Sequence, residues 1–136
     1  MPTGPLPSEL AEFLTKPNPA VIVTLNPDGQ PNSVATWYLW DNGRVLVNMD
    51  ASRARLKNLR RDPRVSLTVL DEASWYNHVS LRGTVVSLED DPDLSDIDRI
   101  STHYMGSAYG DRERDSISAW IEVDTWHGWQ GGKPWR

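Results

Sequence analysis

The chain has 136 residues, a formal net charge of −5 and no cysteine. This length predicts one domain, 1–136, with a core of its own, and the acidic balance argues against general nucleic-acid binding. The lack of cysteine excludes disulfides and thiolate metal sites and fits a reducing cytoplasm. No apolar stretch approaches the roughly 20 residues that span a bilayer, and no signal peptide is readable. We therefore expect a cytoplasmic protein without membrane or nucleic-acid partners.

The first half of the chain predicts a short helix followed by an antiparallel meander. The helix lies within 7–17, where Ser8 can cap it and Pro17 stops it. Segments rich in β-branched or aromatic residues then alternate with tight turns, which is the pattern of hairpin-connected strands. The expected strands are 20–25, 32–40 and 44–49.

The second half predicts further strands and two helices. A helix over 52–62 begins with Asp50 or Ser52 as its cap and ends before Pro63. Gly83 lies inside the longest later strand and indicates a bulge or bend. The expected later elements are strands 64–70, 75–89 and 117–129 and a helix over 95–109, before a mobile tail at 130–136. About six strands, mostly hairpin-connected, predict a mainly β domain, either a small barrel or a sandwich.

The stretch SRARLKNLRRDP at 52–63 is strongly basic within an acidic chain. Together with Arg64 it holds six of the fourteen Lys and Arg residues. Three interpretations are open: a solvated helix face, a nucleic-acid contact, or a site for a small anion. Nucleic acid is disfavoured because the chain has no second basic element and no recognised nucleic-acid motif. A small anion suits the free N–H groups of a helix start, beside which Ser52, Arg55 and Asn58 offer further donors.

The order of these motifs resembles the split β-barrel flavin-binding family, which includes pyridoxamine 5′-phosphate oxidase and oxidoreductases that use coenzyme F420, a deazaflavin. The resemblance is carried by the PDGQP turn between strands, an aromatic strand end, RVLVN, SRARLKNLRRDPRVSL and a long strand with RGTV. It covers about 9–129 and is closest to the short F420-dependent branch. It implies a six-stranded antiparallel split barrel and a homodimer with the cofactor in a groove between subunits. Pyridoxamine-phosphate oxidases bind substrate with an additional C-terminal segment that has no equivalent here, so vitamin B6 oxidation is not expected.

The resemblance also implies which residues bind the cofactor. The residues implied for the cofactor phosphate are Ser52, Arg53, Arg55, Lys57 and Asn58. The residues implied for the ring system are Val34, Ala35, Thr36, Trp37, Val47, Asn48 and Met49. The negative charges of an F420 tail would account for the remaining cations of the segment, although these are equally compatible with a solvated surface. FMN stays an alternative, because its phosphate would meet the same helix start.

The chemistry implied by the resemblance needs no catalytic triad, because a reduced deazaflavin supplies the hydride and the protein positions it. Tyr76 and His78 are candidates for a proton donor, against the alternative that they lie on a wet strand face. The three histidines, His78, His103 and His127, lack the spacing of metal ligands, so no metal site is expected. We expect an F420-dependent oxidoreductase acting on a small unsaturated or conjugated organic substrate. An FMN-dependent oxidase or reductase and a non-catalytic flavin or deazaflavin carrier or sensor remain as alternatives.

Overall fold

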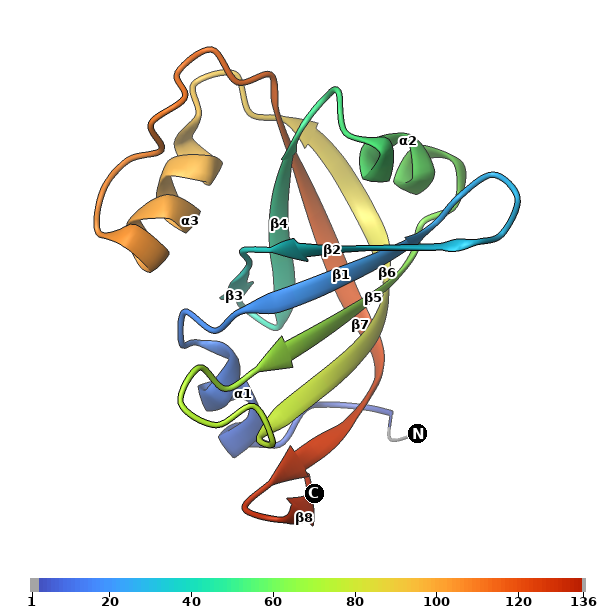
Figure 1. The fold of residues 1–136 in the computed structure, drawn as a ribbon, viewed down its shortest axis with the longest axis vertical. Helices are drawn as coiled ribbons and strands as arrows, with labels where there is room; N and C mark the ends of the chain where they lie inside the picture. Colours follow the sequence, from blue (N-terminus) through green and yellow to red (C-terminus); the bar gives the residue numbers. More distant parts are fainter. Residues whose placement is uncertain (1–2, 136) are drawn as a thin grey trace.

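The computed structural model describes residues 3–135 as a mainly β structure with short helices. The strands are β1 (Ala20–Leu25), β2 (Pro31–Thr36), β3 (Leu39–Asp41), β4 (Arg44–Asp50), β5 (Arg64–Leu70), β6 (His78–Asp90), β7 (Ser116–Gln130) and β8 (Lys133–Pro134). The helices are α1 (Ser8–Leu14), α2 (Ala54–Arg61) and α3 (Ser95–Met105). One antiparallel sheet has the order β2-β1-β5-β6-β7-β4-β3, with β8 paired to β7 (Figure 1). The sheet curls without closing, and the predicted mainly β antiparallel class is confirmed.

The expected strand 32–40 is divided in two, which corrects the predicted count of six strands. β2 pairs with β1, whereas β3 pairs with β4 near the other end of the strand order. Trp37 and Tyr38 carry the chain from one sheet edge to the other. Tyr38 is buried, and its hydroxyl donates a hydrogen bond to the carbonyl oxygen of Leu14 at 2.9 Å. A buried aromatic ring with a satisfied polar tip stabilises this crossing.

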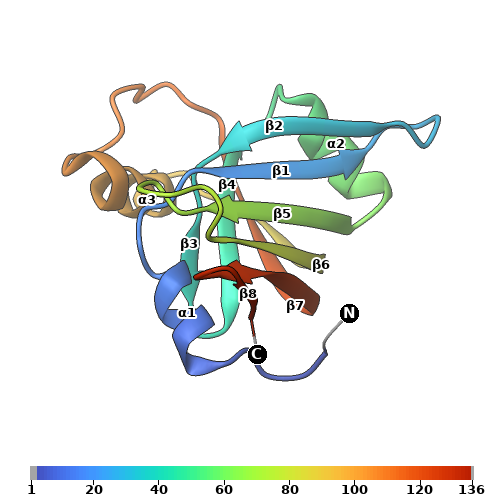
Figure 2. The ribbon, with the colours of Figure 1, turned by 60° about the horizontal axis from the view of Figure 1, so that its bottom comes forward.

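Two apolar clusters organise the core. The main one fills the inside of the curled sheet, and α1 covers one end of it (Figure 2). α1 contributes Leu10, Phe13 and Leu14, which share one helix face because they are spaced by three and four residues. A second cluster lies between α3 and the sheet, and its buried members are Leu46, Leu94, Ile97 and Ile100. This second cluster fixes α3 against β4, where the cavity described below is formed.

The bulge expected at Gly83 is confirmed. The pairing of β6 with β7 shifts register between Arg82 and Gly83. A Cβ atom at Gly83 would lie 2.4 Å from the carbonyl oxygen of Glu122 and 2.7 Å from a side-chain carbon of Ile121. The close approach of the neighbouring backbone therefore requires glycine at this position.

The prediction of a mobile tail at 130–136 is wrong for the described residues of that segment. β8 pairs with the end of β7, and the side chain of Trp135 is only 7% exposed. Its ring lies 5.6 Å from the ring of Phe13, and its Nε1 donates to the carbonyl oxygen of His78 at 2.9 Å. Burial of a large aromatic side chain offsets the entropy lost by ordering the segment.

The basic helix α2 lacks the predicted side-chain cap at its start but ends where the sequence predicts. Arg53 precedes the first helical turn, and no side chain caps it. Ser52 instead donates from its backbone N and its Oγ to Oδ1 of Asp50, at 3.0 and 2.7 Å. The helix ends at Arg61, before Pro63, as predicted.

Two other elements are shorter than expected. The segment 75–77 belongs to the β5–β6 turn, which the backbone hydrogen bond from Asp71 N to Asn77 O closes at 2.9 Å. α3 ends at Met105, because Gly106 takes a left-handed conformation with φ of 78°. Among residues 3–135, no helix has both the length and the apolar character needed to cross a membrane.

Candidate functional site

A cavity of about 520 Å³ lies between the end of β2, the middle of β4, α3 and the loop that follows α3. Most of its lining is apolar or aromatic. The aromatic, polar and charged side chains in that lining include Trp37, Asn48, Glu72, Tyr104, Tyr109 and Arg114. Ala35 and Thr36 of β2 also line it. The structure therefore brings together Ala35, Thr36, Trp37 and Asn48 of the predicted ring-lining set.

An aromatic wall forms one side of the cavity. The rings of Trp37 and Tyr104 stack, with centroids 5.2 Å apart and planes 11° from parallel, and Tyr109 meets Trp37 edge-on at 6.3 Å. The Tyr104 hydroxyl donates to the carbonyl oxygen of Asn18 at 2.6 Å. Burial raises the pKa of Tyr104 to about 12, so its hydroxyl stays protonated at neutral pH. A rigid, neutral aromatic wall suits a planar ring.

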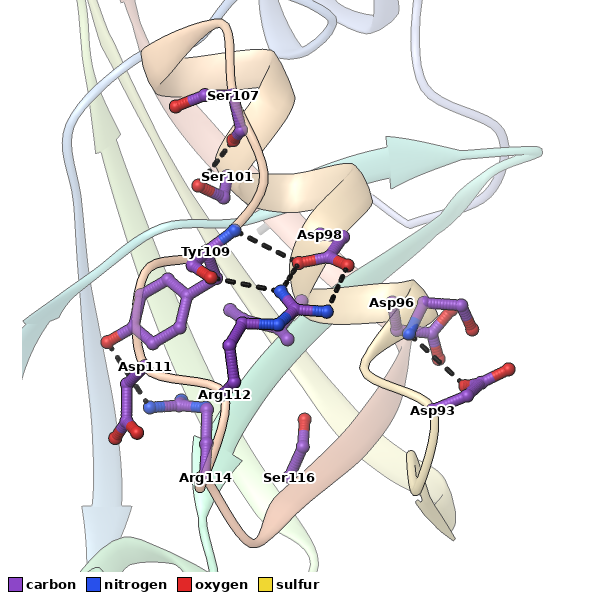
Figure 3. Close-up of polar contacts among 12 residues, drawn as sticks. Asp93, Asp96, Asp98, Ser101, Ser107, Tyr109, Asp111, Arg112, Arg114 and Ser116 are labelled. Atoms are coloured by element: carbon purple, nitrogen blue, oxygen red, sulfur yellow. Dashed lines mark hydrogen bonds and ion pairs between the residues drawn. The ribbon is translucent and has the colours of Figure 1, made fainter.

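The loop between α3 and β7, which carries Tyr109 of this wall and also Arg114, is fastened to α3 (Figure 3). Asp98 of α3 accepts a hydrogen bond from the backbone N of Tyr109 at 3.0 Å. The same carboxylate pairs with Arg112, whose Nη1 lies 2.7 Å from Oδ1 and whose Nη2 lies 3.1 Å from Oδ2. This bidentate contact fixes the loop that carries Tyr109 and Arg114.

Arg114 projects from this loop toward β4. Its Nε donates to Oδ1 of Asn48 at 3.1 Å, and its guanidinium carbon lies 5.0 Å from the ring centroid of Tyr109. Its Nη1 lies 3.5 Å from the Tyr109 hydroxyl oxygen. These partners are neutral, and no carboxylate among residues 3–135 forms an ion pair with Arg114, which lines the cavity.

A buried polar network holds Asn48. Its Nδ2 donates to Oγ of Ser118 at 3.2 Å and to Oδ2 of Asp91 at 3.4 Å. Asp91 also accepts from the backbone N of Asp96 at 3.0 Å and of Ile97 at 3.1 Å, at the start of α3. The network thus connects α3, β4 and β7 and orients the oxygen of Asn48 toward Arg114.

The cations of α2 extend the positive charge beyond the cavity. Arg55 is partly buried, and burial lowers its pKa most, followed by the charges of Arg53 and Arg114. Within residues 3–135, none of these three arginines takes part in an ion pair. Lys57 and Arg60 are exposed on the same helix. A group of close, unpaired guanidinium groups is electrostatically unfavourable until an anion binds between them.

Asn58 and Ser52 use their side chains within the protein. Asn58 is 3% exposed, and its Nδ2 donates to Oγ1 of Thr24 and to Oδ1 of Asn26, both at 3.0 Å. Both amide hydrogens of Asn58 are therefore engaged in fixing α2 to β1 and the turn that follows it. The Ser52 hydroxyl is bonded to Asp50, as described above.

The remaining predicted residues lie apart from the cavity lining. Val47 and Met49 are fully buried in the main core, and Val34 is 36% exposed on β2. Tyr76 is 71% exposed and stacks on Trp75 with ring centroids 4.3 Å apart. Nδ1 of His78 lies 2.9 Å from the carbonyl oxygen of Tyr76.

Sequence reasoning missed Tyr104, Tyr109 and Arg114 as site residues. Helical spacing places Tyr104 on the same face as Ile97 and Ile100, so its proximity to the cavity could have been inferred. Tyr109 and Arg114 lie in an irregular loop, and only the contact with Asp98 in the folded chain determines their positions.

Comparisons with known proteins agree with this architecture. The sequence profile of the pyridoxamine 5′-phosphate oxidase family matches residues 6–130. Among solved structures, an F420 reductase is 22% identical with a TM-score of 0.78, and the match covers 93% of this chain and 98% of that one. A conserved hypothetical protein from Mycobacterium tuberculosis is 23% identical with a TM-score of 0.72, covering 98% and 86%. A Listeria innocua protein named after pyridoxamine 5′-phosphate oxidase is 17% identical with a TM-score of 0.67, covering 87% and 93%. At these identities the solved structures show a common fold.

Proposed function

Because this chain belongs to the pyridoxamine 5′-phosphate oxidase family, whose members are flavin- or deazaflavin-binding oxidoreductases, we propose that it binds coenzyme F420 and transfers a hydride to a small unsaturated or conjugated organic substrate. The cofactor's anionic group would bind between α2 and the loop before β7. Its ring would lie against the aromatic wall of the cavity.

The observation that carries this proposal is the partly buried Arg55, which forms no ion pair within residues 3–135 and interacts electrostatically with Arg114 in the lining of the aromatic cavity. Removing a cation from water costs free energy unless a counter-charge is supplied. Guanidinium groups match phosphoryl oxygens in geometry and offer donors only. Donors beside a flat apolar wall fit a ligand with a planar ring and an anionic group, as flavins and deazaflavins have.

The choice of F420 over FMN is supported by surplus charge. Besides Arg55 and Arg114, the exposed Arg53, Lys57 and Arg60 form no ion pair within the described part of the chain. An F420 tail carries more negative charge than the single phosphate of FMN and can interact with these outer cations. The similarity in fold to an F420 reductase points in the same direction.

The bound cofactor would supply hydride-transfer chemistry, and the chain's own residues would bind and orient it. Trp37, Tyr104 and Tyr109 would exclude water from one face of the ring. Arg55 would hold the anionic group at a fixed distance from that wall.

A homodimer is part of the proposal. β2 lies at a sheet edge, and its outer side pairs with no other strand among residues 3–135. Its residues are mostly exposed, including the apolar Val34. The unpaired N–H and C=O groups of an exposed edge strand are a template for pairing with another chain, and a second copy beside β2 would also enclose the cavity.

Fluorescence titration of the purified protein with F420 and with FMN tests the proposal. Tighter binding of F420 is expected, followed by consumption of bound reduced F420 when unsaturated acceptors are added. Preferential binding of FMN would instead identify an FMN-dependent oxidoreductase. Binding of F420 without consumption over a broad acceptor panel would favour a carrier or sensor.

A further inference from the structure

We propose that Arg114 is a second anion-binding residue, which acts with Arg55 to hold one phosphoryl group between two elements of the fold, and that Asn48 is the positioning residue for Arg114. The inference rests on the proposed function, because the phosphoryl group considered is that of the bound cofactor. It assigns a role to the loop between α3 and β7, which lies far along the chain from the basic helix.

The contacts of Arg114 leave most of its hydrogen-bonding capacity available. Nε is occupied by Oδ1 of Asn48 at 3.1 Å, while the contact from Nη1 to the Tyr109 hydroxyl is long at 3.5 Å. A guanidinium group has five N–H donors, so the terminal nitrogens can still bind an oxyanion. Arg114 also lines the cavity, which gives a ligand access to those nitrogens.

The Asp50 carboxylate, whose pKa the charge of Arg114 affects, already has other hydrogen-bond partners. Hydrogen bonds from Ser52 lower the pKa of Asp50 most, and the charge of Arg114 makes a smaller contribution. Oδ1 of Asp50 accepts from Ser52, and Oδ2 accepts from the backbone N of Asp115 at 3.2 Å. Asp50 therefore shapes the segment before α2, and it forms no ion pair with Arg114.

Arg55 and Arg114 come from different elements, and the charge of Arg114 adds to burial and to the charge of Arg53 in lowering the pKa of Arg55. The backbone of Asp115, next to Arg114, accepts a hydrogen bond from the backbone N of Ala51 at 2.8 Å and donates one to Oδ2 of Asp50 at 3.2 Å, which places the loop beside the segment that leads into α2. A phosphoryl group has enough oxygens to accept from both guanidinium groups, so its binding would turn repulsion into attraction. The buried hydrogen bonds of Asn48 to Ser118 and Asp91 keep Arg114 in place when no ligand is present.

Arg114 also connects the anion site to the aromatic wall. Its guanidinium carbon lies 5.0 Å from the Tyr109 ring centroid, while Tyr109 contacts Trp37. A ligand whose phosphoryl group lies between Arg55 and Arg114 can thus extend its ring along Trp37 and Tyr104. The chemical group recognised is the phosphoryl group, and the ring alone would not require Arg114.

The test compares F420 with its core chromophore, which lacks the lactyl phosphate and glutamate tail, in fluorescence titrations. Arg114→Gln should weaken F420 binding by about tenfold or more and leave core-chromophore binding within about twofold. Arg114→Lys should restore part of the F420 affinity. Asn48→Ala should weaken F420 binding in the wild type and have little further effect in the Arg114→Gln background, because the two residues act through one guanidinium group.

Arg82→Gln is the matched control, since Arg82 is exposed on β6, away from this site. Equal F420 affinity in the wild type and Arg114→Gln, with weakened binding in Arg55→Ala, would overturn the inference and leave the proposed function standing. Wild-type protein that binds neither F420 nor FMN would contradict the proposed function. In that case thermal stabilisation by inorganic phosphate decides the inference: stabilisation lost in Arg114→Gln supports it, and equal stabilisation refutes it.

Discussion

Asp98 on α3 and Arg112 on the following loop form a bidentate ion pair with a shortest contact of 2.7 Å (Figure 3). The same carboxylate accepts from the backbone N of Tyr109. One side chain of α3 thereby determines where the loop places Tyr109 and Arg114 relative to the cavity.

Asp98→Asn is expected to loosen this loop more than it destabilises the fold. Solvent-exposed ion pairs contribute little to the free energy of unfolding, so thermal unfolding should change little. The affinity for F420 should fall by up to about fivefold, because the loop residues would no longer be held in position. Asp111→Asn, on the same loop, is the control. Unchanged affinity in Asp98→Asn would show that the loop keeps its position without the ion pair.

Asp62 should make stability depend on pH in the acid range. Its hydrogen bonds with Arg64, first from the side chain and then from the backbone, lower its pKa to about 2. Because the folded-state pKa lies below the unfolded value of about 3.9, the stabilisation is present above pH 4 and is lost as pH falls toward 2. In urea denaturation, the stability difference between wild type and Asp62→Asn should therefore narrow over that interval. A difference that stays constant from pH 6 to pH 2 would contradict the assignment.

Asn58→Ala is expected to lower the stability of the folded protein. The variant leaves the buried hydroxyl of Thr24 without its donor and removes an anchor of α2. The free energy of unfolding should fall by about 1–3 kcal/mol, whereas Asn32→Ala at a less buried strand position should cost less. If the folded variant instead keeps its stability and loses F420 affinity, Asn58 contacts the cofactor directly.

Trp135→Ala should destabilise the protein by about 3–5 kcal/mol in urea denaturation, the range for truncating a buried aromatic side chain. Trp129 offers a comparison, because its side chain is 47% exposed against 7% for Trp135. Trp129→Ala should cost clearly less. Equal effects of the two substitutions would argue against the packing of the C-terminal segment on Phe13.

Local patterns predicted most elements because turn residues and helix breakers act at their own positions. Pro63 and Gly83 are examples, since one ends α2 and the other forms a bulge in β6. The break between β2 and β3 could not be predicted, because strand propensity continues through Trp37 and Tyr38. The change of sheet edge depends on tertiary packing, in which the Tyr38 hydroxyl donates to a carbonyl oxygen of α1.

The candidate site was predictable where its residues follow one another in the chain. The basic segment and the end of β2 carry a readable signal of charge and aromatic character. Arg114 carries no such signal, because its position depends on how the loop after α3 folds against α3 and against residues 50–51 before α2. Asn58 shows the opposite case: its type suits a phosphate contact, while burial directs its amide to Thr24 and Asn26.

The most direct test of the account is the F420 affinity of Arg55→Ala, measured by fluorescence titration beside wild type and the control Arg82→Ala. The account predicts a loss of roughly 2 kcal/mol or more of binding free energy in Arg55→Ala, the scale of a charge-assisted contact, and no change in the control. An Arg55→Ala protein that is folded and binds F420 as tightly as wild type would contradict the claim that this arginine holds the coenzyme's anionic group.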